Sequence, residues 1–126
     1  MILYLDTSSL LKLYVEEAHS ADVAAGVDEA EIVATSVVSY VECLSALARR
    51  CRGGDLSRER RDDLVAALAG HWPRYLVLQI DERRAGDLAL RDRPENVQVS
   101  FSSLDRPLNR AARAEGLNVL APEGFV

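Results

Sequence analysis

Short apolar runs rich in β-branched and aromatic residues recur along the chain, each bounded by polar or turn-forming residues. They predict five strands, at residues 2–5, 32–34, 76–80, 97–101 and 118–120. The stretches between them have apolar positions at helical spacing or helix-ending glycines. They predict helices at residues 9–15, 19–27, 38–50, 57–69, 83–91 and 107–115.

The alternation of strands and helices determines the expected fold class. Such a pattern implies right-handed β-α-β crossovers and a mostly parallel sheet that is covered on both faces. A chain of 126 residues is about the size of one domain, and it has no internal repeat or linker. We therefore expect one domain over residues 1–126, an α/β fold with three α/β/α layers and a sheet of about five strands.

The first apolar run ends abruptly in Asp6, followed by the hydroxyls of Thr7, Ser8 and Ser9. In parallel α/β sheets, ligands bind outside the carboxyl ends of the strands, and Asp6 follows such an end. Asp and Ser are also favoured caps of helices. The pattern therefore leaves two interpretations open, a helix cap and a site that handles charge.

Glu42 lies near the start of the helix that follows the second strand. Ser39 and Glu42 form the S-x-x-E pattern of a capping box. A helix that begins nearer Ser36 would instead place Glu42 in the second turn, beside Val41 and at the edge of the buried stripe. The second interpretation makes Glu42 available to a site.

Asp105 repeats the opening arrangement after the fourth strand. Ser103 precedes it, and Pro107 opens the next helix. If the first and fourth strands are neighbours across a switch point, Asp6, Glu42 and Asp105 can converge.

Three carboxylates that converge must bind a cation, spread apart or take up protons. Two unit charges 4 Å apart repel by about 4 kcal/mol at an effective dielectric near 20. The chain has no Cys/His cluster, and His19 and His71 are isolated, which is typical of surface or packing residues. An oxygen-only site favours Mg²⁺, with Mn²⁺ as a substitute, over zinc.

Composition and charge narrow the class of protein. The net charge of −5 argues against binding nucleic acid through bulk electrostatics. A local basic patch remains an alternative to a solvated helix end, at Arg49, Arg50, Arg52, Arg58, Arg60 and Arg61. Cys43 and Cys51 lie eight residues apart in one expected helix, about 12 Å along its axis and too far for a disulfide. Reduced thiols, no membrane span and no signal peptide predict a cytoplasmic protein.

Three segments resemble the PIN-domain ribonucleases, and among them the VapC-type toxins of toxin–antitoxin pairs. They are LYLDTSSLLKLYVEE, ATSVVSYVECLSALARR and SFSSLDRPLNRAARAEGLNVL. The resemblance implies that Asp6, Glu42 and Asp105 are catalytic and bind metal, supported by Thr7, Ser8 and Ser103. It also implies Mg²⁺-dependent hydrolysis of RNA, a cognate antitoxin that docks near the site, and a homodimer.

The chain departs from the family pattern at residues 81–96. The family has a further acidic residue there, on a helix with an R-x-x-D-A-x-H-L-A motif, and this chain has only DERRAGDLALRDRPEN. We favour loss of the stretch that carries the acidic residue. In the alternative alignment, Asp87 fills its role.

Two functions of different classes follow, with a third as a comparison. The leading hypothesis is a VapC-like endoribonuclease. The second is an impaired PIN domain that binds a protein partner without cleaving RNA. Haloacid-dehalogenase phosphotransferases also use a strand-end Asp, but they need a second Asp two residues on, where this chain has Ser8.

Overall fold

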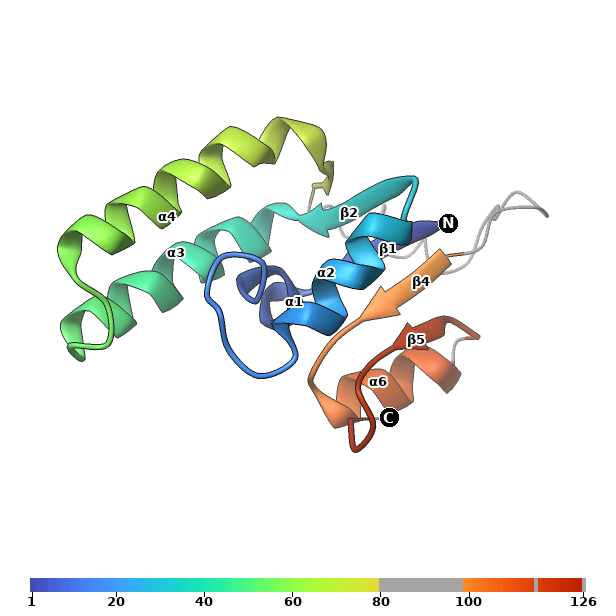
Figure 1. The fold of residues 1–126 in the computed structure, drawn as a ribbon. Coiled ribbons are helices and arrows are strands. Elements are labelled where there is room, and N and C mark those ends of the chain that lie inside the picture. The colour runs from blue at the N-terminus through green and yellow to red at the C-terminus, as the bar shows by residue number, and fades with distance from the viewer. Residues whose placement is uncertain (80–98, 115, 126) are drawn as a thin grey trace.

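The computed structural model describes residues 1–79, 99–114 and 116–125. The strands of these ranges form one sheet in which every neighbouring pair is parallel (Figure 1). In spatial order, the strands are β3 (Leu76–Leu78), β2 (Ile32–Ser36), β1 (Ile2–Leu5), β4 (Val99–Ser102) and β5 (Asn118–Leu120). The predicted α/β fold with a parallel sheet of five strands is confirmed.

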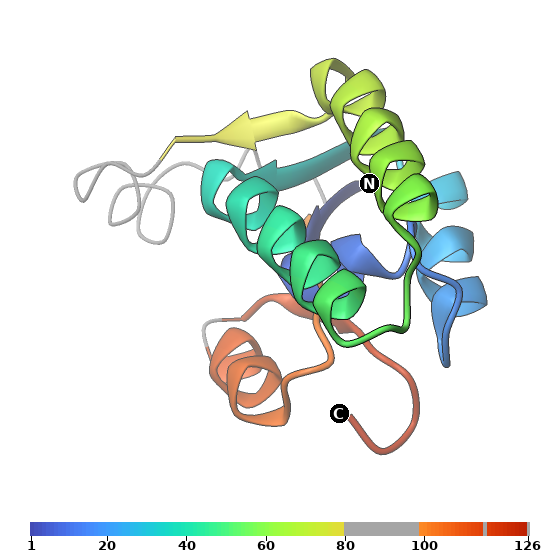
Figure 2. The same cartoon turned by 90° about the vertical axis from the view of Figure 1, so that its left-hand side faces the viewer.

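Helices lie on both sides of this sheet. They are α1 (Thr7–Leu11), α2 (Ser20–Glu29), α3 (Val37–Arg52), α4 (Arg58–His71) and α6 (Arg106–Ala114), with a short 3₁₀ helix, η1 (Trp72–Arg74). Figure 2 shows α2 and α4 on one side of the sheet and α6 on the other. This is the expected order of three layers.

Several boundaries differ from the predicted ones. The first helix begins at Thr7, two residues earlier than expected. The reason is that Asp6 is its N-cap, because the Asp6 carboxylate accepts a hydrogen bond from the Ser9 N–H. The second strand continues to Ser36. The third strand ends at Leu78, so the prediction was wrong for Gln79. The rest of that predicted strand end at 80, the predicted strand start at 97–98, the helix expected at 83–91 and the helix end at 115 lie outside the described residues.

The core lies on the face of the sheet that bears Leu3 and Leu5, both almost fully buried. The helices that cover it contribute leucines, a valine and a cysteine, namely Leu10, Val23, Cys43, Leu47, Leu64 and Leu68. Each fully buried aliphatic side chain stabilises the fold by about 1.5–3 kcal/mol. Within the described ranges, no helix is both long and apolar enough to cross a membrane.

The strand order reverses next to β1. The chain runs outward from β1 through β2 to β3, and β4 then adds to the other side of β1. Leu5 is paired with Ser102, and the Asp6 N–H donates to the Ser102 carbonyl at 3.3 Å. The prediction that the first and fourth strands are neighbours across a switch point is confirmed. It places Asp6 and Ser103 side by side.

Candidate active site

All three predicted carboxylates line one cavity of about 670 Å³ at the carboxyl ends of the central strands. Asp6 comes from the end of β1, Glu42 from α3, and Asp105 from the loop before α6. Thr7 and Ser8 also line it. The sheet topology therefore brings together residues that lie up to 99 positions apart in the sequence.

Both carboxylate oxygens of Asp6 accept hydrogen bonds. Oδ1 accepts from the Ser9 N–H at 3.0 Å and from the Ser8 hydroxyl at 2.8 Å. Oδ2 accepts from the Ser103 hydroxyl at 2.6 Å. Asp6 is thus the cap of α1 and a lining residue of the cavity at once, so both interpretations left open by the sequence apply. Oδ1 thus uses both of its lone pairs, whereas Oδ2 keeps a second lone pair for another ligand.

Ser103 connects Asp6 to Asp105. Its hydroxyl donates to Asp6 and accepts from the Asp105 N–H at 3.0 Å. Asp105 in turn caps α6, because its Oδ1 accepts from the Leu108 N–H at 3.0 Å. Ser8 adds a second link, since its hydroxyl accepts from the Leu104 N–H at 3.1 Å. Ser8 and Ser103, the two serines expected to support the site, thus both donate hydrogen bonds to the Asp6 carboxylate.

Glu42 is positioned by the start of α3. Ser36 is the N-cap of this helix and its hydroxyl accepts from the Ser39 N–H, so Glu42 lies in the second turn and makes no capping box. One part of the expectation was wrong. Glu42 is exposed, its neighbour Val41 is 59% exposed, and the buried face carries Cys43 and Leu47 instead. The carboxylate therefore reaches the cavity from solvent and not from the edge of a buried stripe.

Thr7 supports the site indirectly. Its hydroxyl donates to Ser39 Oγ at 3.2 Å and so ties α1 to α3. The Thr35 hydroxyl donates to the Leu5 carbonyl at 2.9 Å in the interior. These bonds fix the end of β1 relative to the helix that carries Glu42.

The carboxylates affect titratable groups behind the cavity. Burial, together with the negative charges of Glu42 and Asp6, raises the pKa of Cys43 to about 12. Its thiol therefore stays protonated at neutral pH and is no nucleophile. Burial also raises the pKa of Tyr4, again with added effects from Asp6 and Glu42.

The donor set suits a hard divalent cation, since only carboxylate and hydroxyl oxygens are offered. The spacing is wider than in a closed metal cage. Over residues 1–79, 99–114 and 116–125, no group of three or more His, Cys, Asp or Glu side chains is close enough to hold an ion. A cation of the Mg²⁺ type commonly keeps several waters and uses one or two carboxylates, so this wide spacing does not conflict with the expected cation. Asp87 and the segment 81–96 lie outside the described residues.

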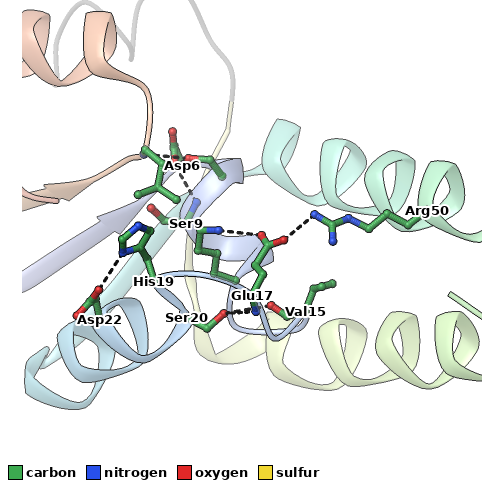
Figure 3. A network of polar contacts seen from close by, with 11 residues as sticks. Asp6, Ser9, Val15, Glu17, His19, Ser20, Asp22 and Arg50 are labelled. Atoms are coloured by element: carbon green, nitrogen blue, oxygen red, sulfur yellow. Dashed lines mark hydrogen bonds and ion pairs between the residues drawn. The ribbon is translucent and has the colours of Figure 1, made fainter. Parts of the chain in front are cut away.

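The six arginines of the predicted patch have different surroundings. The Arg50 guanidinium donates to Glu17 at 2.8 Å, and Lys12 binds the other oxygen of Glu17 at 2.8 Å. Figure 3 shows Arg50 reaching from α3 to Glu17 in the loop before α2. Arg61 pairs with Asp62. Arg49, in contrast, lines the acidic cavity.

Sequence reasoning missed two residues that hold this region together. Glu17 connects α3 to the α1–α2 loop across 33 residues, and no local pattern marks such a pair. Asn109 is fully buried, and its side-chain amide donates to the carbonyls of Ser103 and Phe125 at 3.0 and 2.7 Å. The sequence signal that could have indicated this role is the position of Asn109 on the buried face of α6, four residues after Asp105.

Comparisons with known proteins bear on the fold. No protein-family model and no curated protein matches the sequence. Among solved structures, the chain is similar to the crystal structure of VapC20 from Mycobacterium tuberculosis, described as a toxin that cleaves the sarcin-ricin loop. The sequence identity is 20%, the match covers 98% of this chain and 92% of VapC20, and the TM-score is 0.51. The expected PIN-like fold is thereby confirmed.

Proposed function

We propose that this chain is a Mg²⁺-dependent endoribonuclease, the toxin of a type II toxin–antitoxin pair. The observation that carries the proposal is the meeting of Asp6, Glu42 and Asp105 in one cavity at the switch point of the sheet. The fold shared with VapC20, itself described as a toxin that cleaves the sarcin-ricin loop, supports the same function. The reaction is hydrolysis: water attacks the phosphorus, and the bond from phosphorus to one ester oxygen breaks.

The proposed roles follow from the contacts. Within the described residues, Asp6 is the proposed ligand with the most hydrogen-bond support, because its carboxylate accepts hydrogen bonds from the Ser9 N–H and from the Ser8 and Ser103 hydroxyls. Glu42, on α3, and Asp105, in the loop before α6, add two further negative charges to the cavity. A bound cation supplies neutralisation of the phosphate charge and activation of the attacking water. An exposed site suits single-stranded or looped RNA, whose backbone is accessible.

The test is cleavage of labelled single-stranded RNA by purified protein with Mg²⁺, with Mn²⁺ and with chelator. Wild-type protein is expected to cut only with metal. Asp6→Asn keeps a hydrogen-bonding cap but removes the charge, so it is expected to lower the rate by at least about a hundredfold. Circular dichroism of the variant checks that it is folded.

Asp63→Asn is the matched control. Asp63 is exposed on α4, and the change has the same chemistry outside the cavity. Cutting that survives in Asp6→Asn, or that chelator does not stop, would contradict the proposal. Loss of activity in both variants would point to a general charge effect, whereas undiminished cutting by both would point to a contaminating nuclease.

A second function is favoured by the rim of the cavity. Val41 and Leu108 line the cavity and are 59% and 42% exposed. Apolar side chains beside carboxylates suit a partner segment with apolar and basic residues. An antitoxin that docks there, or a catalytically impaired domain that only binds such a partner or a second copy of itself, would use this surface. Folded protein that binds a partner but never cuts RNA would favour the impaired form.

A further inference from the structure

Arg49 has a place that distinguishes it from the rest of the arginine patch. Glu42, Ser45, Ala46 and Arg49 are spaced along one face of α3, and all four line the cavity. Arg49 is the only positively charged side chain among the described residues that line it, opposite three carboxylates. It follows Glu42 by seven residues, which is about 10 Å along a helix axis.

Its neighbours in the patch have other surroundings. Arg50 is held by Glu17, and Arg61 by Asp62, each at 2.8–2.9 Å. Arg52 is exposed at the end of α3 and does not line the cavity. Arg49 is exposed, and within the described part of the chain no ion pair occupies its guanidinium.

We propose that Arg49 is a positioning residue that binds an RNA phosphate beyond the scissile one. A polyanion that enters a cavity lined by three carboxylates is repelled unless a cation offsets part of the charge. The guanidinium is always charged and can bind a phosphate through two hydrogen bonds. Because it lies about 10 Å further along the axis of α3 than Glu42, it would orient the strand without contacting the reacting atoms. This inference rests on the proposed ribonuclease function.

The test compares Arg49→Gln with Arg52→Gln for binding of a short labelled single-stranded RNA. Both residues lie in the last turn of α3, so both changes remove the same charge from the same helix end. Binding is measured by fluorescence anisotropy in chelator, where no metal-dependent cutting occurs, over a series of salt concentrations. Thermal stability is expected to change equally in the two variants.

Arg49→Gln is expected to weaken binding about five- to tenfold and to lower the slope of log affinity against log salt by about 0.7, the value for one phosphate contact on a single strand. Arg49→Lys is expected to restore the slope and part of the affinity. Arg52→Gln is expected to change the RNA affinity by less than about twofold and to leave the salt slope near the wild-type value.

The inference is overturned if Arg49→Gln binds as wild type does, if Arg52→Gln loses as much, or if wild-type protein binds no RNA. The cleavage assay is a separate readout. Binding that depends on Arg49 in a protein that never cuts would support this inference and contradict the proposed function. Cutting that depends on Asp6, with unchanged binding in Arg49→Gln, would do the reverse.

Discussion

One hydroxyl, that of Ser103, touches both strand-end acidic residues. It donates to the Asp6 carboxylate at 2.6 Å and accepts from the Asp105 N–H at 3.0 Å. Ser103 is fully buried, so water cannot replace it without rearrangement. The orientation of two proposed ligands therefore depends on a side chain that never needs to touch the substrate.

Ser103→Ala is expected to lower the RNA cleavage rate about tenfold, equivalent to about 1.4 kcal/mol in the barrier. The change removes a bond to Asp6 and leaves the Asp105 N–H without an acceptor, which also costs about 1–3 kcal/mol of stability. Single-turnover cleavage and thermal unfolding measure the two effects.

Ser9→Ala is the control for this change. The Ser9 hydroxyl pairs with the Ser102 hydroxyl at 3.0 Å in the interior, and it makes no bond to the Asp6 carboxylate. Its loss should lower stability but leave cleavage by the folded protein near the wild-type rate. If both variants lose activity equally, the Ser103 effect is one of stability and not of ligand orientation.

The residues of the candidate site were predictable where a local sequence pattern marked them. Asp6 and Asp105 each follow an apolar run and precede a helix, and both cap those helices in the structure. The exposure of Glu42 was not predictable in the same way. Which face of α3 turns towards the sheet depends on packing against leucines that are distant in the sequence, and not on the sequence of α3 alone.

At the scale of elements, a triad of charges ties the loop after α1 to the far half of α3. Glu17 binds Lys12 through Oε1 and Arg50 through Oε2, each at 2.8 Å. The hydrogen bond from Lys12 lowers the pKa of Glu17, Arg50 lowers it as well, and partial burial opposes them. The loop thus has a fixed attachment to the helix that carries Glu42 and Arg49.

Glu17→Gln is expected to destabilise the fold by about 1 kcal/mol at neutral pH. Because the pKa is lower in the folded state, the unfolded chain binds more protons at acidic pH. The stabilisation is therefore fully present above the unfolded pKa near 4.3 and is lost as the pH falls through the lowered folded value. Denaturant unfolding of both proteins between pH about 7 and 3 measures this difference.

Glu16→Gln provides the comparison, since Glu16 is the exposed neighbour in the same loop. It is expected to leave stability within about 0.5 kcal/mol of wild type at every pH. A gap between Glu17→Gln and wild type that persists below pH 3 would mean that the lost stability is steric and not electrostatic.

Which elements form was largely predictable, and their contacts were not. The strands at residues 2–5 and 118–120 were predicted to the residue, because turn-forming or polar residues bound each run. The early start of α1 followed from Asp6, whose capping role was recognised but not applied to the boundary. The Glu17–Arg50 pair spans two elements, and tertiary pairs of this kind have no periodic signal.

At the scale of the whole molecule, the layer formed by α2 approaches the sheet closely at Gly26. A Cβ at this position would lie 3.4 Å from Leu3 Cδ2 in β1 and 3.9 Å from Leu120 Cδ1 in β5. Both distances are ordinary van der Waals contacts, so a methyl group fits and a larger side chain does not. Gly70 in α4 gives the opposite case, because a Cβ there would meet nothing within 4 Å.

These two glycines allow the spacing of the layers to be tested. Gly26→Ala and Gly70→Ala are each expected to raise the free energy of unfolding by about 0.5–1 kcal/mol, because alanine favours the helix. Gly26→Leu is expected to lower it by about 1–3 kcal/mol through overpacking against Leu3 and Leu120, whereas Gly70→Leu should remain stabilising. Denaturant unfolding of the four variants measures these changes. Equal effects of leucine at both positions would mean that α2 does not pack against the sheet at this distance, and the three-layer arrangement around β1 would have to be revised.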